Sequence, residues 1–183
     1  MQVKWPAGPP YFYANVWFAR ELILTGTVMT IDPSSGSKGS MPGFAIAERG
    51  EITRYGIIEL PITSGKKIVT PQARYFALVE RLKDLIPGRP DVLLIEQIGS
   101  KVHHLLLEAV GVSIVGAGTH NVIRVHNQVW KALANVMPGY EKGDSADAFM
   151  MCKAVLMIAK KFSEKDFSGF TEEALSKIKK EYR

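Results

Sequence analysis

Residues Ile23–Ile31 (ILTGTVMTI) are rich in apolar and β-branched side chains, a pattern that predicts a buried strand ending at Asp32-Pro33. A second short apolar run, Val92–Gln97 (VLLIEQ), is typical of a strand inside a parallel sheet. Each run carries a carboxylate, Asp32 or Glu96, at or near its C-terminal end. An ionised carboxylate in or beside a core is costly unless it is paired or bound to a cation. Both acids therefore require an explanation.

The rest of the chain predicts strands first and then helices that alternate with strands. Phe44–Glu48 and Glu51–Ile58 predict a hairpin around Arg49-Gly50. Thr70-Pro71 predicts the start of a helix, because Thr caps helices and Pro suits the first helical position. The other expected elements are a helix at 101–110, strands at 112–117 and 122–125, a segment at 127–136, a long helix from about 144 to 162 and a basic helix at 172–182. This order predicts an α/β fold with a mixed central sheet flanked by helices.

The composition limits the class of protein. The 183 residues suffice for one ordinary domain, and 46% hydrophobic with 22% charged residues excludes a disordered chain and a collagen-like repeat. The single cysteine, Cys152, allows no internal disulfide and is expected to be buried. We find no signal peptide and no apolar run long enough to cross a membrane, so a cytoplasmic protein is expected. The net charge of +5 is a mild indication of a polyanionic partner.

The N-terminal segment, residues 1–21, is expected to be an aromatic arm. Residues 1–20 hold six of the seventeen aromatic side chains, and prolines at 6, 9 and 10 argue against an early helix. The aromatic rings would either form a stacking surface for bases or pack on the core, and packing is favoured. Residues 22–162 are expected to form the main domain, with the basic helix at 163–183 belonging to it.

Two further acids accompany Asp32 and Glu96. Asp144 and Asp147 open the predicted long helix and, spaced i, i+3, project from one face. Taken singly, these acids have ordinary explanations: a turn start, a buried ion pair or a helix cap. Taken together, they would converge if the long helix packs across the sheet. Four oxygen ligands without Cys or His suit Mg²⁺ or Mn²⁺, and two such ions support phosphodiester hydrolysis.

Five short segments together resemble the motifs of the RuvC Holliday-junction resolvase family, within the RNase H-like superfamily. Thr30–Pro33 (TIDP) and Gly43–Ile46 (GFAI) look like its opening motif, and Leu94–Gln97 (LIEQ) looks like its second motif. Asp144–Ala148 (DSADA) resembles its terminal aspartate pair, and Gln128–Lys131 (QVWK) is similar to a segment whose lysine serves DNA binding. The motifs occur in the family's order across about residues 23–160.

The resemblance implies an RNase H-like mixed five-stranded sheet flanked by helices on both faces, Mg²⁺-dependent cleavage of branched DNA and a homodimer. It implies that Asp32, Glu96, Asp144 and Asp147 are the catalytic metal ligands, and that Lys131 contacts a phosphate. The chain departs from the family after Asp32-Pro33, where serines replace the usual Gly and the loop to Gly43 is long. The stretch between the second and last motifs also looks short. Strict four-way-junction specificity thus stays open, and a phage-type member would accommodate these differences.

Other polar residues are secondary candidates for nucleic-acid binding. His126 lies near Lys131 in the sequence, and Lys38 lies in the loop after Asp32, where a solvated lysine is the ordinary interpretation. His103 and His104 follow Glu96 but face different ways on a helix. Two alternatives keep the same fold: an RNA-directed RNase H-like nuclease, and a nucleic-acid-binding module without catalysis.

Overall fold

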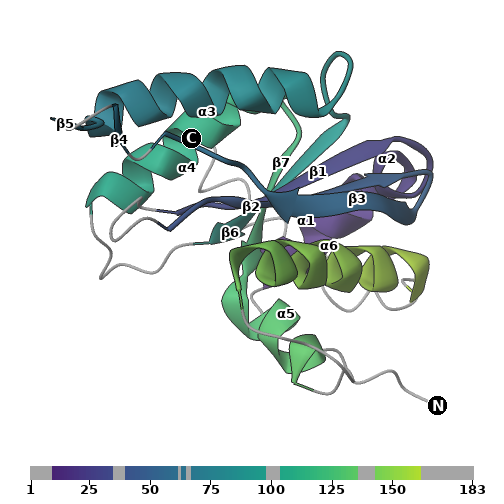
Figure 1. The fold of residues 1–183 in the computed structure, drawn as a ribbon. Helices are drawn as coiled ribbons and strands as arrows, with labels where there is room; N and C mark the ends of the chain where they lie inside the picture. The colour runs from purple at the N-terminus through teal and green to yellow at the C-terminus, as the bar shows by residue number, and fades with distance from the viewer. Residues whose placement is uncertain are drawn as a thin grey trace.

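A five-stranded mixed sheet forms the centre of the computed structural model, which describes residues 10–34, 40–61, 63–64, 67–97, 104–135 and 143–161. Its strand order is β3-β2-β1-β6-β7, and helices cover both faces (Figure 1). The strands of this sheet are β1 (Thr27–Asp32), β2 (Gly43–Glu48), β3 (Glu51–Ile57), β6 (Val92–Gln97) and β7 (Val122–His126), and β4 (Thr63–Ser64) pairs separately with β5 (Lys67–Ile68). The helices are α1 (Pro10–Phe18), α2 (Arg20–Thr25), α3 (Pro71–Leu85), α4 (His104–Ala117), α5 (Asn127–Ala134) and α6 (Asp144–Lys161). The predicted fold class is confirmed.

Strand β1 is the central strand of the sheet, with an antiparallel neighbour on one side and a parallel neighbour on the other. It runs antiparallel to β2 and parallel to β6, and β6 runs parallel to β7. In the β1–β6 register Ile31 lies opposite Ile95. The next residues, Asp32 at the end of β1 and Glu96 one residue before the end of β6, therefore lie at the same level, as the sequence predicts.

Alternation along the strands separates two cores. Val28 of β1 and Leu94 of β6 belong to the core that contains α1, α5 and α6, whereas Met29 and Leu93 belong to the core beneath α3. Figure 1 shows α3 and α4 on one side of the sheet and α5 and α6 on the other. Because side chains alternate with period two, Asp32 and Glu96 project to the α6 face of the sheet.

Local signals fixed two element ends as expected. Arg49 and Gly50 have φ of 51° and 76°, the positive values that a tight two-residue hairpin turn requires. The Thr70 side-chain oxygen accepts a hydrogen bond from the Ala73 N–H at 3.3 Å and caps α3. Both predictions are confirmed.

Two expectations for the first thirty residues are wrong. Helix α1 begins at Pro10, where the missing proline N–H costs nothing because the first turn of a helix leaves its N–H groups without intrahelical partners. The predicted strand at 23–31 starts only at Thr27, since its first residues complete α2. The rings of Phe12 and Tyr13 are buried in the α6-side core, so this part of the arm packs on the core, as favoured.

The predicted strand at 112–117 is also wrong, because α4 continues through it to Ala117. Its apolar, β-branched composition looks like a buried strand, yet its buried residues are small and recur every four positions, at Ala109, Ser113 and Ala117. Gly116 has no side chain, and a Cβ there would lie 2.9 Å from Leu82 of α3. Small residues therefore let α4 pack closely on α3.

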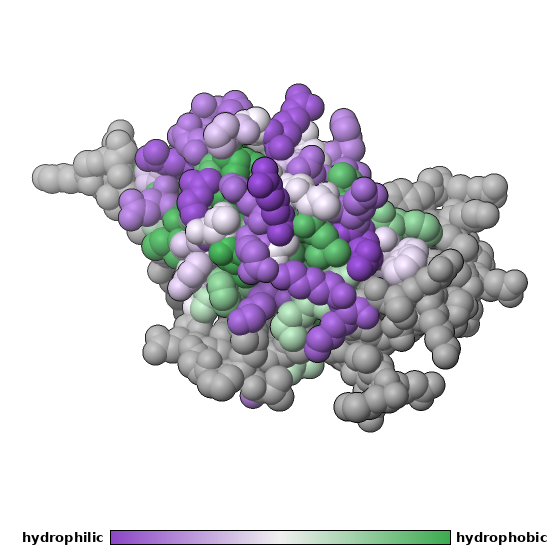
Figure 2. Space-filling model, turned by 90° about the vertical axis from the view of Figure 1, so that its right-hand side faces the viewer, coloured by the Kyte–Doolittle hydropathy of each residue, from purple (hydrophilic) through white to green (hydrophobic). Residues whose placement is uncertain are grey.

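Several expectations concern other parts of the chain. Cys152 is buried as expected, and burial raises the pKa of its thiol to about 11. Lys38, His103 and the basic helix at 172–182 lie outside the described residues. Among the helices that the structure describes, none combines the length and apolarity needed to span a bilayer. Figure 2 shows the molecule from the right of Figure 1, a face where hydrophilic side chains alternate with small hydrophobic areas.

Candidate active site

Asp32 lies at the centre of a group of four acids. It is only 8% exposed at the end of β1. The pKa of its carboxyl is raised to about 8, first by burial and then by the charges of Glu96, Asp147 and Asp144, while Lys131 opposes them. The other three acids predicted from the sequence are thus within electrostatic range of Asp32.

Helix α6 approaches the sheet at Gly43. This residue pairs with Asp32 across β1 and β2, and a Cβ on it would lie 1.8 Å from the Asp144 carbonyl oxygen. The Met41 backbone hydrogen-bonds to the Asp144 carboxyl and lowers its pKa, although burial and Asp147 raise that pKa overall. The absence of a side chain at position 43 therefore brings the start of α6 against the strand ends.

Glu96 lies close to the lysine of α5, Lys131. The Lys131 Nζ on α5 lies 3.9 Å from the Glu96 Oε1 and 4.9 Å from the centroid of the Trp130 ring. Burial raises the pKa of Glu96, whereas Lys131 and the nearby indole of Trp130 lower it. The indole Nε1 is buried and has no hydrogen bond of regular geometry. Lys131 is half exposed, so it can serve both Glu96 and an incoming anion.

The donor chemistry of the four acids suits a divalent cation. All the candidate ligands are carboxylate oxygens. The charges of the other three raise the pKa of Asp32, and Asp147 raises that of Asp144, as expected of a site that lacks enough positive charge. Within the described residues, no three acids, histidines or cysteines are already drawn together closely enough to hold a metal ion. The residues therefore fit a hard cation in type and charge, with their carboxylates spread more widely than a coordination shell.

His126 ends β7 at the end of the sheet where Glu96 lies. It lies opposite Gln97 in the β6–β7 register, and its Nδ1 accepts the Gln128 N–H at 3.3 Å. This contact caps α5 and requires an unprotonated Nδ1, so the neutral ring carries its proton on Nε2. His126 is consequently on the same edge of the sheet as Glu96, while Lys38 lies outside the described residues.

Three supporting contacts were not predicted from the sequence. Gly43 stood within a recognised motif, but only the structure shows why it is glycine. The buried Arg74 of α3 donates from Nη2 to the Ser40 carbonyl at 3.0 Å, just before the Met41 backbone that holds Asp144. Its i, i+4, i+8 spacing with the buried Leu78 and Leu82 was a signal available in the sequence.

The third of these contacts comes from the N-terminal helix. The Tyr11 hydroxyl of α1 donates to the Gln97 Oε1 at 2.9 Å, one residue beyond Glu96. This bond ties α1 to the strand end that carries the acid. A tyrosine in a proline-rich, aromatic segment gave no indication of this partner in the sequence.

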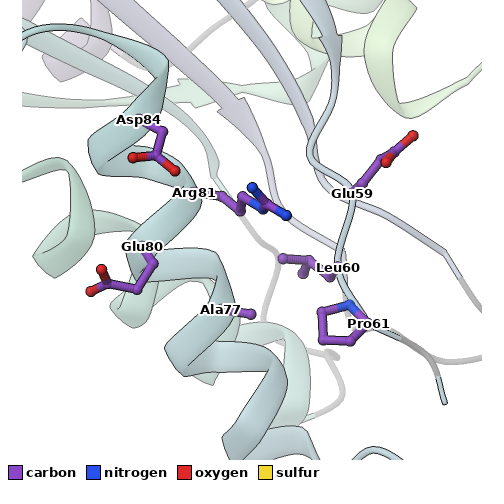
Figure 3. Close-up of a pocket in the computed structure, with 7 residues that line it drawn as sticks. All are labelled: Glu59, Leu60, Pro61, Ala77, Glu80, Arg81 and Asp84. Carbon is purple, nitrogen blue, oxygen red and sulfur yellow. The ribbon is translucent and has the colours of Figure 1, made fainter. Parts of the chain in front are cut away.

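A hollow of about 530 Å³ lies elsewhere, between α3 and the segment that follows β3. Figure 3 shows Arg81 extending from α3 toward this segment. The side chains of Glu59 and Glu80 point away from the hollow. Leu60 at its edge belongs to the core beneath α3. The hollow therefore opens on the sheet face opposite the four acids, and we assign it no part in their chemistry.

Comparison with known proteins bears on the fold. No family model and no curated protein matches the sequence. Among solved structures, the RuvC of T. thermophilus in complex with a Holliday junction substrate aligns with 73% of this chain and 92% of its own, at 15% identity and a TM-score of 0.50. The chain has a RuvC-like fold. A second structure, of Thermus thermophilus RuvC, covers 73% of this chain and 93% of its own at 16% identity and a TM-score of 0.47.

The RuvC-like fold agrees with the mixed five-stranded sheet expected from the motifs. At this level of identity the likeness concerns the architecture alone. Any proposal for Asp32, Glu96, Asp144 and Asp147 therefore has to rest on their own placement in this chain.

Proposed function

We propose that the protein is a metal-dependent endonuclease that cleaves Holliday junctions or other branched DNA by phosphodiester hydrolysis. The observation that carries this proposal is the buried Asp32 carboxyl with three further acids around it, at the C-terminal ends of two parallel central strands. Sites of α/β proteins commonly lie at this edge of the sheet. The RuvC-like fold supports the same substrate class, since the neighbour of that fold was solved with a Holliday junction substrate.

Asp32, Glu96, Asp144 and Asp147 would hold Mg²⁺ or Mn²⁺, in a site for two ions. Such ions, when bound, activate water and stabilise the leaving oxygen of a phosphodiester. The protein's own contribution is to bury Asp32 and to hold its neighbours by backbone contacts from Met41 and Gly43. Hydrolysis would leave 5′-phosphate and 3′-hydroxyl ends.

Two residues beside the acids would bind the DNA backbone. Lys131 is exposed enough to exchange its contact with Glu96 for a phosphate. The Nε2–H of His126 is available to donate, because its Nδ1 already accepts the Gln128 N–H. If four of the 18 acids hold cations, the remaining charge is 23 − 14 = +9, which suits a polyanionic substrate. Lys38 remains a further proposed contact.

A homodimer is part of the proposal, and α4 offers a surface for it. Leu107 and Val115 are exposed on this helix, and Gly111 between them faces open space. Their i, i+4, i+8 spacing forms an apolar stripe that a second copy would cover. Light scattering of the wild type and of Val115→Glu measures the mass directly. A wild-type mass of one chain would refute this part.

A nicking assay tests the proposed activity. Labelled four-way junctions, flaps and RNA–DNA hybrids are incubated with and without Mg²⁺, using wild type, Asp32→Asn, Asp147→Asn and the exposed-acid control Asp84→Asn. We expect Mg²⁺-dependent cleavage of branched DNA that the first two variants lose and Asp84→Asn keeps. Binding of DNA should survive in Asp32→Asn.

Each contrary result has a definite meaning. Preferential cleavage of hybrids would favour an RNA-directed nuclease. Binding without any Mg²⁺-dependent cleavage would favour a non-catalytic module. An Asp32→Asn variant that cuts at the normal rate would refute the assignment of the site.

A further inference from the structure

The edge strand β3 exposes apolar side chains on the face that carries the acids. Tyr55 is 59% exposed and Ile57 is 50% exposed. Ile57 lies opposite Gly43, which lies opposite Asp32, and Tyr55 lies opposite Ala45 of the α6-side core. Alternation therefore places Tyr55 and Ile57 on the α6 face, and Ile57 is level with the end of β1.

Helix α6 completes this surface with an aromatic ring and a cation. The rings of Tyr55 and Phe149 are 4.8 Å apart and tilted by 53°. The Lys153 Nζ lies 5.5 Å from the centroid of the Phe149 ring. Within the described chain, Lys153 forms no ion pair. We call Tyr55, Ile57, Phe149 and Lys153 the β3–α6 patch.

The patch lies close to the acids but on the other flank of α6. Two strand spacings and two residues along β3 separate Tyr55 from Asp32 by about 12 Å. Phe149 follows Asp147 by two residues, which is about 200° around a helix, so the two side chains leave α6 in opposite directions. A molecule bound to the patch would therefore lie near the reacting phosphate without overlapping the position that the phosphate occupies at the acids.

We propose that the β3–α6 patch binds an unpaired nucleotide of the nucleic-acid substrate, an inference that rests on the proposed function. A base would stack on Tyr55 beside Phe149, and its phosphate would lie near Lys153. An exposed ring such as Tyr55, with an unpaired cation near it, is a combination by which proteins bind single strands without reading sequence. A base within a duplex has both faces covered by its neighbours, so only unpaired nucleotides near a branch can use the patch.

The test measures binding of uncleaved DNA without metal, by fluorescence anisotropy. A dye-labelled duplex with a single-stranded flap is compared with a fully paired duplex of the same sequence. Tyr55→Ala should weaken binding of the flapped DNA about tenfold and leave the paired duplex unchanged, while Tyr55→Phe keeps the ring and the affinity. Lys153→Gln should reduce the salt slope for flapped DNA by about one.

The matched controls are the exposed Phe76→Ala on α3 and Lys161→Gln at the end of α6, which should bind both DNAs as wild type does. Equal affinity of Tyr55→Ala and wild type for flapped DNA would overturn the inference. Equal losses on both DNAs would overturn it too. A change in oligomeric mass with Tyr55→Ala would assign the patch to a second copy of the chain instead.

Failure of the inference is separable from failure of the proposed function. A protein that cuts branched DNA without any effect of Tyr55→Ala loses the patch and keeps the nuclease. A protein that binds flapped DNA through Tyr55 but never cuts it loses the nuclease and keeps the patch.

Discussion

Gly43 and Asp144 touch through their backbones: a Cβ on residue 43 would come to 1.8 Å from the Asp144 carbonyl oxygen. No side chain fits at this point unless α6 moves. Because Gly43 is also the β2 partner of Asp32, one glycine sets the spacing between a strand-end acid and a helix-start acid. The distance between β1 and the start of α6 in the candidate site therefore depends on residue 43 having no side chain.

Gly43→Ala should displace the start of α6 and reduce cleavage of branched DNA about a hundredfold, since an error of about 1 Å at a reacting centre costs that much. Single-turnover cleavage and thermal unfolding measure the two consequences. The control is Phe76→Ala, an exposed position on α3 on the other side of the sheet, which should leave cleavage unchanged. Wild-type cleavage by Gly43→Ala would contradict this account of the site.

The pKa of Asp32 predicts how stability depends on pH without metal. Folding raises the pKa of this carboxyl from 3.8 to about 8, through burial first and then the neighbouring acids. Its protonated form is thus favoured in the folded state, and the resulting stability is present below pH 4 and lost as pH rises through 8. In EDTA, wild type should lose on the order of 3 kcal/mol relative to Asp32→Asn between pH 5 and pH 9.

Denaturant unfolding across this pH range makes that measurement. Mg²⁺ should remove most of the decline, because a bound cation compensates the charge that burial penalises. If the unfolding free energies of wild type and Asp32→Asn in EDTA change with pH in parallel, Asp32 ionises with an ordinary pKa and the prediction is refuted.

Two substitutions separate the roles of His126. His126→Ala removes the Nδ1 acceptor that caps α5 and should cost about 1 kcal/mol of stability, whereas His126→Asn keeps a capping oxygen and should unfold as wild type does. Both variants lose the Nε2–H, so both should bind DNA more weakly by the same factor. Unequal DNA affinities that follow the stabilities would show that His126 acts only as a cap.

Arg74 should act on the site through the chain segment at Ser40–Met41. Arg74→Met removes the donor to the Ser40 carbonyl, and we expect Mn²⁺ to bind about tenfold more weakly, the usual effect of losing an outer contact. Arg74→Lys keeps a donor and should recover part of the affinity. Calorimetric titration with Mn²⁺ measures both. An unchanged affinity in Arg74→Met would remove Arg74 from the support of the site.

The sequence was sufficient to predict the central strands and their acids. β1 and β6 are short runs of mostly apolar or β-branched residues. Asp32 ends β1 and Glu96 is next to the end of β6, so the composition of each segment indicates both its burial and the position of its acid. The start of α6 was equally readable, because Asp144 and Asp147 precede a long apolar run. These are properties of single segments, which a sequence carries locally.

The errors arose where a distant partner decides the structure. Val112 and Ile114 look like strand residues, and α3 makes them helical by packing on the small residues beside them. Gly43 and Arg74 serve the site through backbone atoms of Asp144 and Ser40, and no periodicity reports a contact across so many residues. The sequence therefore indicates the candidate residues of the site, but not the atoms that position them.

The hydrogen bond between Tyr11 and Gln97 joins residues that are 86 positions apart, and this separation matters for the nascent chain on the ribosome. During synthesis at about 5–20 residues per second, Tyr11 emerges roughly 4–17 seconds before its partner exists. Throughout that interval Phe12 and Tyr13 have no core to enter, because the strands and α6 that bury them are still unmade. Helix α1 can therefore dock only after most of the sheet and α6 have been made, and its apolar rings are exposed until then.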